Sequence, residues 1–268
     1  MTNAVVTALA MQKGGVGKST CTICLARALR VYHQARVLVV DFDPQGNTSG
    51  TLALNPIAAD AVRIGDVIIP DTDVAIDEVI VPTIWDGVDL APGGPTTAAA
   101  EKHIVASDHG REYRLREALE PVLSSYDAVL IDNAPALGLL LVNALTAADK
   151  ALFVVEADQW SADGLTLLRK TLDGVLRYHN RSLDMVGTIV NKWRETKTHA
   201  ELAAEIQTGM ALHFPGVPVW MDRRIPLWTG IPDYIQAGKG LDEGPTRLRV
   251  LAQDTFKPIA GELLGRAA

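Results

Sequence analysis

Short apolar runs alternate along the chain with longer segments whose apolar residues recur every three or four positions. The short runs predict buried strands at Val5–Met11, Val37–Asp41, Val88–Ala91, Ala128–Asp132, Ala151–Glu156 and Val186–Asn191. The longer segments predict helices, notably Ser19–Tyr32, Tyr113–Leu123, Leu137–Ala147, Ala162–Tyr178 and His199–Met210. Because strands and helices alternate, we expect an α/β fold, a mostly parallel doubly wound sheet flanked by helices.

No sequence repeat, low-complexity tract or linker divides the chain. Its 268 residues, 48% of them hydrophobic, can bury one α/β core, so residues 1–268 are expected to form a single domain. Residues 54–86 are rich in Pro, Asp, Ile and Val and predict a surface excursion with short elements. The absence of a membrane-length apolar stretch and of a secretory signal leads us to expect a cytoplasmic protein.

A glycine-rich segment follows the first predicted strand. Residues 12–19, Gln-Lys-Gly-Gly-Val-Gly-Lys-Ser, fit the phosphate-binding pattern G-x-x-x-x-G-K-[ST] only if Lys13 lies where most such loops begin to turn. Glycines let backbone N–H groups point inward around the β-phosphate of a nucleotide, and here they are Gly14, Gly15 and Gly17. Lys18 then reaches the β- and γ-phosphates, and the Ser19 hydroxyl can ligate Mg²⁺. The alternative is a plain glycine-rich turn that joins the strand to the helix, and the match of the motif together with its strand and helix context favours the phosphate-binding loop.

Carboxylates follow two other predicted strands. Asp41 ends one strand, Asp43 lies just beyond it, and Asp132 ends another. Carboxylates at this edge of an open α/β sheet can hold Mg²⁺ or orient an attacking water. Ordinary turn chemistry, with Pro44 and Gly46 close by, also explains an aspartate here.

Lys13 precedes the glycines, where its ammonium group points away from its own loop. At this point the chain resembles the deviant Walker A ATPases, the ParA/MinD family of P-loop NTPases, whose first lysine acts across a nucleotide-sandwich dimer. Further stretches carry the resemblance: VLVVDFDPQGN (Val37–Asn47), DAVLIDNAPALGLLLVNALTAAD (Asp127–Asp149) and GREYRLREAL (Gly110–Leu119). The last two are similar to the partition branch. The chain departs from the family's D-x-P-P pattern at Ala134, which gives a less rigid loop with an extra backbone N–H.

The resemblance implies an ATPase that needs ATP and Mg²⁺. It implies that Lys13, Lys18 and Asp43 are catalytic, with Asp43 activating the water, and that Ser19, Asp41 and Asp132 lie on the magnesium side. The implied nucleotide-binding residues are Gly14, Gly15, Val16, Gly17, Lys18, Ser19, Thr20 and Asn191. Asn191 matches the position from which the family reads the adenine edge, since an amide offers both donor and acceptor; a strand-end cap is the plainer interpretation.

The resemblance also implies a homodimer in the ATP state that binds nonspecific DNA. A ParB-like centromere-binding protein would stimulate hydrolysis, and the protein would be nucleoid-associated. Nonspecific binding depends on Lys and Arg contacts to phosphates, for which the candidates are Lys192, Arg194, Lys197, Arg223, Arg224, Arg247 and Arg249. Taken singly, each is better explained as solvated surface charge. The net charge of −7 means that any DNA contact must be local.

Other functions stay open at this stage. A MinD-like ATPase acts at the membrane and needs a basic amphipathic C-terminal helix, but the tail Phe256–Ala268 has only Lys257 and Arg266 as bases, so we expect no membrane partner. A metabolic ATP-dependent amidoligase needs a site for a small carboxylate, and a nucleotide-binding scaffold needs no catalytic groups. No segment long enough for a helix-turn-helix domain precedes the first strand, so an autorepressor role is not expected.

Two cysteines, Cys21 and Cys24, lie three positions apart on the helix after the glycine-rich loop. A C-x-x-C pair can bind metal or cycle between redox states, but no second pair accompanies it here. We therefore predict buried thiols that pack against the sheet.

Overall fold

The computed structural model describes residues 3–11, 13–157 and 162–266. These residues form a seven-stranded sheet with the strand order β3-β4-β2-β5-β1-β6-β7. Neighbouring strands run parallel except β3 and β4, which are antiparallel. The strands are β1 Val5–Ala10, β2 Val37–Phe42, β3 Val81–Pro82, β4 Val88–Ala91, β5 Ala128–Asn133, β6 Lys150–Glu156 and β7 Asp184–Asn191. The predicted fold class and all six predicted strands are confirmed.

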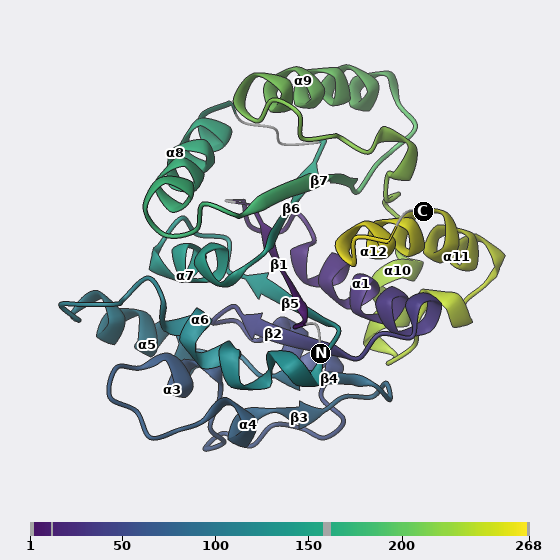
Figure 1. Ribbon diagram of the computed structural model, residues 1–268. Coiled ribbons are helices and arrows are strands. Elements are labelled where there is room, and N and C mark those ends of the chain that lie inside the picture. Colours follow the sequence, from purple (N-terminus) through teal and green to yellow (C-terminus); the bar gives the residue numbers. More distant parts are fainter. Residues whose placement is uncertain (1–2, 12, 158–161, 267–268) are drawn as a thin grey trace.

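Helices cover both faces of the sheet (Figure 1). One face carries α1 Lys18–His33, α10 Gly230–Gln236, α11 Thr246–Leu251 and α12 Lys257–Leu263. The other carries α3 Ile64–Ile68, α5 Pro95–Val105, α6 Arg114–Leu119, α7 Leu139–Ala147 and α8 Ala162–Tyr178, with α9 Lys197–His213 next to α8. The short helix α2 Asn47–Leu52 follows β2, and the short helix α4 Ile76–Val79 precedes β3. The central strands β2 and β5 are buried on both faces, which explains their continuous apolar sequences.

Some helix bounds differ from the prediction. The segment expected as Tyr113–Leu123 is helical as α6 only to Leu119 and continues as a 3₁₀ turn, Glu120–Ser125. Pro121 explains the change, because its ring removes a backbone donor and crowds the preceding turn. Helix α9 starts earlier than predicted because the Thr196 side chain accepts a hydrogen bond from the His199 N–H at 3.2 Å, which caps the helix.

Residues 54–86 contain only short elements, as predicted. They include α3, α4 and the two-residue strand β3, which the sequence did not predict because two residues carry no alternating pattern. Its residues Val81 and Pro82 pair with Leu90 and Asp89 of β4. Proline has no backbone N–H to donate to a further strand, and an edge strand has no neighbour on its outer side. Pro82 is therefore tolerated here, and this short strand can end the sheet.

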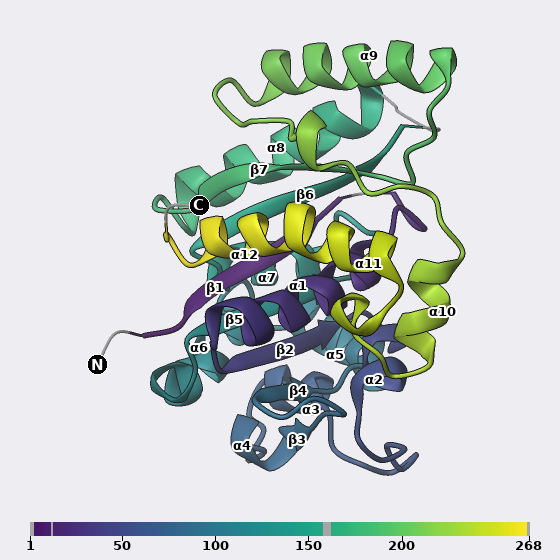
Figure 2. The same ribbon diagram turned by 90° about the vertical axis from the view of Figure 1, so that its right-hand side faces the viewer.

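The register brings the carboxyl ends of the central strands together. Asp132 of β5 is paired with Asp41 of β2 on one side and with Leu9 of β1 on the other. The loop after β1, the turn after β2 and the turn after β5 therefore meet at one edge of the sheet. Figure 2 shows that α2 and α10 lie at the same end of the molecule, toward which β1 runs.

Candidate functional site

The glycine-rich loop joins β1 to α1 at this edge. Gly15 and Gly17 have backbone φ angles of 78° and 91°, a region that other residues rarely adopt. Gly17 is the N-cap of α1, so the first backbone N–H groups of the helix face the loop. A Cβ at Gly17 would collide with the Asn191 side-chain nitrogen, so only glycine allows this close approach.

Lys18 is 6% exposed, and its ammonium group folds back onto the loop. Lys18 Nζ donates to the carbonyls of Met11 and Lys13, each at 3.3 Å. Burial lowers the pKa of Lys18, while the charges of Asp132 and Asp43 partly raise it again. The ammonium group is thus a buried cation within the field of two carboxylates, in position to neutralise phosphate charge.

A cavity of about 490 Å³ opens in front of this lysine. Its walls come from the glycine-rich loop, the turn after β2, the turn after β5 and α10. The lining residues are Gly15, Gly17, Lys18, Ser19, Thr20, Ile23, Asp43, Gln45, Asn47, Thr51, Pro135, Pro232, Ile235 and Gln236. The structure therefore brings the predicted residues Lys18, Ser19 and Asp43 together in one place.

Asp43 lies at the wall of this cavity and is 9% exposed. Its Oδ1 accepts the Gln45 backbone N–H at 2.9 Å, an Asx turn that fixes the side chain. The predicted turn interpretation of Asp43 is therefore correct. The turn leaves room for a role in the cavity, because it uses only Oδ1. Among the described residues, Asp43 Oδ2 has no hydrogen-bond partner.

Asp132 is 1% exposed and, like Asp41, is not among the residues that line the cavity. Its Oδ2 accepts the Thr48 hydroxyl at 2.6 Å, whereas its Oδ1 has no hydrogen-bond partner among residues 3–11, 13–157 and 162–266. Burial raises the pKa of Asp132, and the hydrogen bond from Thr48, the nearby Ser19 hydroxyl and the charge of Lys18 oppose that rise. A buried carboxylate oxygen without a donor, next to the Ser19 hydroxyl, is the kind of hard oxygen set that suits Mg²⁺.

Asp41 makes different contacts. Its Oδ2 accepts both the Ser49 N–H at 2.7 Å and the Ser49 hydroxyl at 2.6 Å, and its Oδ1 accepts the Asp43 N–H at 3.3 Å. It is fully buried and does not line the cavity. Burial, with the charge of Asp132, raises the pKa of Asp41 to about 7. The structure thus places Asp41 behind the site, where it ties α2 to β2, and not at the cavity wall where a direct metal ligand would lie.

Asn191, at the end of β7, contacts the glycine-rich loop. Its Nδ2 donates to the Val16 carbonyl at 2.7 Å, and the residue is 5% exposed. A second cavity of about 300 Å³ adjoins it, lined by Gly15, Gly17, Thr20, Asn191, Lys192, Pro226, Leu227, Trp228, Thr229, Ile231 and Pro232. The apolar side chains of this cavity can hold a flat ring, with the Asn191 amide at its inner end. Adenine recognition by Asn191 stays a prediction.

The loop after β5 closes one side of the site. Pro135 lies against the glycine-rich loop, since a Cβ at Gly14 would be 3.6 Å from the Pro135 ring. Ala134, where the family pattern has a proline, is half-buried and Pro135 is exposed. Lys13 is half-buried, and its backbone carbonyl accepts a hydrogen bond from Lys18 Nζ.

The basic residues after β7 fall into paired and exposed side chains. Lys192 Nζ lies 3.1 Å from Glu156 Oε2, and Arg224 Nη2 lies 3.6 Å from Glu195 Oε1. Arg194 is exposed, and the Lys197 side chain is 93% exposed with a 3.7 Å contact to Glu201. Arg194 and Lys197 are therefore the candidates of this group that solvent reaches most freely.

The other candidates face different neighbours. Arg223 is largely buried at 18% exposure and lies 3.7 Å from Glu262 of α12. The guanidinium group of Arg247 stacks 5.2 Å from the Trp228 ring, and Arg249 Nη1 donates to the Gly244 carbonyl at 3.0 Å. The seven predicted DNA-binding residues therefore do not share one local environment, and Arg223 is poorly placed to reach a ligand.

Two parts of the site were missed by the sequence analysis. Thr48 and Ser49 of α2 supply the hydroxyls that hold Asp132 and Asp41, and they directly follow the DFDPQGN stretch. Helix α10 supplies Pro232, Ile235 and Gln236 to the cavity wall. The position of Thr48 and Ser49 beside a recognised motif was a usable signal, whereas α10 lies almost 200 residues further along and carried none.

Comparison with known proteins gives consistent matches. A family model described as an AAA domain (AAA_31) matches residues 4–185. An uncharacterized protein of Mycobacterium tuberculosis is 42% identical over 190 residues, 71% of this chain and 58% of that relative. The chromosome partitioning protein ParA of Caulobacter vibrioides is 34% identical over 202 residues, 75% of this chain and 74% of that protein. The match thus spans less than two thirds of the Mycobacterium tuberculosis relative.

Solved structures share the architecture. Cobyrinic acid a,c-diamide synthase from Mycobacterium smegmatis, with bound ATP analog and magnesium, superposes with a TM-score of 0.77 at 26% identity over 93% of this chain and 92% of that chain. A complex of McdA with ATP from Cyanothece superposes with a TM-score of 0.85 at 20% identity over 100% of this chain and 99% of that chain. The second likeness is one of fold alone.

Proposed function

Because the chain belongs to the ParA family of P-loop ATPases, we propose that it is a magnesium-dependent ATPase whose ATP-bound form is a dimer that binds DNA without sequence preference. Slow hydrolysis, stimulated by a ParB-like centromere-binding protein, releases the DNA and so moves a cargo. The observation that carries the proposal is the convergence of Lys18, Ser19 and Asp43 on one cavity of about 490 Å³ at the carboxyl edge of the sheet.

The glycine-rich loop and α1 form the phosphate-binding part of this site. The N–H groups of residues 14–20 surround the β-phosphate at the positive end of the helix, and Lys18 exchanges its carbonyl partners for β- and γ-phosphate oxygens. Asn191 keeps the loop in shape through Val16 and presents the rest of its amide to the adenine edge. The second cavity, behind Thr20, would then take the nucleobase.

Ser19 and Asp132 are the residues that would hold magnesium. When bound, Mg²⁺ would neutralise the negative charge that develops on the phosphate oxygens during phosphoryl transfer. The Ser19 hydroxyl would be a direct ligand, and Asp132, whose Oδ1 has no hydrogen-bond partner among the described residues, would hold the metal's water shell. Asp41 would act indirectly, because it does not line the cavity but fixes the position of α2 through its hydrogen bonds with Ser49.

Asp43 is the residue proposed to orient the attacking water. Its carboxylate lines the cavity, and the Asx turn with Gln45 limits its rotation. A fixed carboxylate can accept a proton or a hydrogen bond from a water molecule that is positioned for in-line attack on the γ-phosphate. Because this arrangement supplies positioning and no covalent chemistry, we expect slow turnover.

Lys13 is proposed to act across the dimer. Lys18 Nζ donates a hydrogen bond to the backbone carbonyl of Lys13, which fixes this part of the loop, and the Lys13 ammonium group would reach the γ-phosphate of the partner subunit when the dimer closes. ATP then closes the dimer because each subunit contributes a cation to the other's nucleotide, and phosphate loss removes that attraction.

This mechanism is tested by two lysine variants. Lys18→Ala is expected to lose nucleotide binding, because it removes the cation inside the cavity. Lys13→Ala is expected to keep nucleotide binding within about tenfold, a loss of about 1.4 kcal/mol, but to lose ATP-dependent dimerisation and hydrolysis. Nucleotide affinity by calorimetry, mass by light scattering and phosphate release would be measured for both. A Lys13→Ala protein that dimerises and hydrolyses ATP normally would show that the two-subunit mechanism is wrong.

DNA binding is proposed for the surface after β7. Arg194 and Lys197 are the exposed members, with Lys192, Arg224, Arg247 and Arg249 as supporting charges and Arg223 as the least accessible of the predicted set. Phosphate contacts by such side chains need no base recognition. In this proposal the protein is cytoplasmic, nucleoid-associated in its ATP state, and has no membrane partner.

A second candidate, an ATP-dependent amidoligase, is favoured by the 26% identity to cobyrinic acid a,c-diamide synthase. The membrane alternative is less favoured because α12 buries Ile259, Ala260 and Leu263 inside the protein. Within the described ranges, moreover, none of the helices has the length and apolarity needed to cross a bilayer. Hydrolysis that DNA stimulates favours the partition function, whereas hydrolysis that only a small carboxylate substrate and an amide donor stimulate favours the amidoligase.

A further inference from the structure

Helix α10 forms one wall of both cavities at the site. Ile235 and Gln236 line the cavity in front of Lys18, Ile231 lines the adjoining cavity, and Pro232 lines both. The helix has seven residues, and a helix this short has little stability of its own. Its position over the site therefore depends on tertiary contacts, made by its buried side chains Ile231 and Ile235 and by the segment that follows it.

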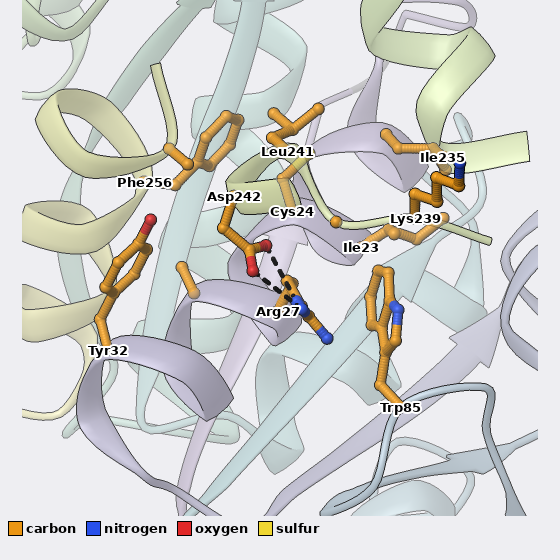
Figure 3. A pocket seen from close by; sticks show the side chains of 13 residues that line it. Ile23, Cys24, Arg27, Tyr32, Trp85, Ile235, Lys239, Leu241, Asp242 and Phe256 are labelled. Atoms are coloured by element: carbon orange, nitrogen blue, oxygen red, sulfur yellow. Dashed lines mark hydrogen bonds and ion pairs between the residues drawn. The ribbon is translucent and has the colours of Figure 1, made fainter. Parts of the chain in front are cut away.

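The segment after α10 is held by an ion pair with α1 (Figure 3). Arg27 Nε donates to Asp242 Oδ1 at 2.9 Å, and Arg27 Nη2 donates to Asp242 Oδ2 at 2.8 Å, which is a bidentate pair. Arg27 Nη2 also lies 3.3 Å from Glu243 Oε1. The side chains of Arg27 and Asp242 are 18% and 16% exposed, so solvent screens the pair only in part.

Trp85, from residues 54–86, also contacts Arg27. Arg27, Asp242 and Trp85 together are called the joint. The Trp85 ring lies 5.2 Å from the Arg27 guanidinium carbon, and its Nε1 donates to the Gly238 carbonyl at 3.2 Å. Figure 3 shows Arg27 between Asp242 and the Trp85 ring. Gly238 lies two residues after the last residue of α10, so the indole hydrogen bond fixes the segment just beyond the end of the helix that lines the nucleotide cavity.

The joint is packed and has no room for a ligand of its own. Its internal cavity is only about 10 Å³, with Ile23, Cys24, Ile235, Leu241 and Phe256 among its mostly apolar lining. Two of these side chains, Ile23 of α1 and Ile235 of α10, also line the cavity in front of Lys18. A shift of α10 at the joint is therefore a shift of the wall of the nucleotide cavity.

We propose that Arg27, Asp242 and Trp85 are positioning residues that hold α10 against the nucleotide cavity and so slow the release of bound nucleotide. The proposal rests on the proposed function, because it takes the cavity in front of Lys18 to be the nucleotide site. None of the three residues touches that cavity, and each acts through α10.

The test is the dissociation rate of N-methylanthraniloyl-ATP, measured in stopped flow by displacement with excess ATP. Asp242→Asn removes the charge and one acceptor of the bidentate pair, and Trp85→Phe removes only the indole donor. We expect roughly a five- to tenfold faster release for Asp242→Asn and a smaller increase for Trp85→Phe, with association rates within twofold of wild type. Arg36→Gln is the matched control, because it breaks another Arg–Asp pair, Arg36 with Asp127, away from α10.

Unfolding midpoints in urea separate positioning from loss of structure. Arg36→Gln should leave release unchanged, and a variant that lowers the midpoint without faster release would show a merely structural joint. Release from Asp242→Asn and Trp85→Phe within twofold of wild type would overturn the proposal while leaving the nucleotide site intact. If wild-type protein does not bind N-methylanthraniloyl-ATP or ATP at all, the proposed function itself fails.

Discussion

Asp41, Asp132 and Lys18 form a buried charge cluster in which each group compensates the others only in part. Burial raises the pKa of both carboxyls and lowers that of the lysine, so every group is shifted toward its neutral form. Hydroxyls from α2 satisfy one oxygen of each carboxylate. Such a cluster is costly in a core without function, which supports its assignment to a phosphate and metal site.

The glycines of the loop predict unequal effects of substitution. Gly15→Ala meets no atom within 4 Å and should cost about 1–2 kcal/mol for its positive φ alone. Gly17→Ala has the same backbone penalty and also displaces the Asn191 amide from Val16, so it should be less stable than Gly15→Ala and should lose nucleotide binding. Urea unfolding and calorimetric titration of both variants check this order, and equal nucleotide affinities would contradict it.

The two cysteines give a second prediction at the residue scale. Cys21 is 0% and Cys24 is 5% exposed, as the sequence predicted, and burial raises the pKa of both thiols. Since thiolate is the reactive form, native protein should show no rapid reaction with 5,5′-dithiobis(2-nitrobenzoate), whereas guanidinium-unfolded protein should release both thiols. Fast labelling of the native protein would argue against buried, inert cysteines.

At the scale of elements, α2 is the helix whose position matters most to the chemistry. Ser49 holds it through one hydroxyl, which donates to Asp41 Oδ2 at 2.6 Å and accepts the Gly93 N–H at 2.9 Å. Ser49→Ala leaves a buried carboxylate with fewer donors and should lower the free energy of unfolding by about 1–3 kcal/mol. Thr208→Ala, which removes a hydroxyl on exposed α9, is the control and should change stability by less than about 0.5 kcal/mol. Equal losses in the two variants would refute this role.

The strands and the glycine-rich loop could be predicted because their sequence signals are local. A strand buried on both faces is continuously apolar, and Gly17 and Lys18 stand in a fixed pattern between such a strand and a helix. Helix α10 could not be predicted in this way. Its seven residues include Gly230 and Pro232, and its place depends on Arg27 and on Trp85, far away in the chain.

For the site residues, the sequence predicted which residues gather at the site but not the direction in which each side chain points. The sequence placed Asp41, Asp43 and Asp132 at one edge of the sheet, and the structure agrees. It could not tell that Asp41 turns toward Ser49 while Asp43 faces the cavity, because that choice depends on the path of the chain after β2. The organisation of residues 1–268 as a single domain stays a prediction.

At the scale of the whole molecule, charge limits how the protein can meet DNA. With a net charge of −7, the chain as a whole repels a polyanion, so binding needs a local basic surface and should weaken steeply with salt. In the proposed dimer any such surface would be doubled, and with both copies on one duplex the effective concentration of the second contact would be raised. ATP-dependent dimerisation and ATP-dependent DNA binding are therefore expected to appear together.

The most direct test is binding to a nonspecific DNA duplex as a function of salt, with ATP, with ADP and without nucleotide. Our account predicts tight binding only with ATP, a linear fall of log affinity with log salt, and a shallower slope for Arg194→Ala/Lys197→Ala. Lys170→Ala, which removes an exposed lysine of α8, should change nothing. Equal DNA affinity in all three nucleotide states, or no binding in any of them while ATP still drives dimerisation, would contradict the central claim.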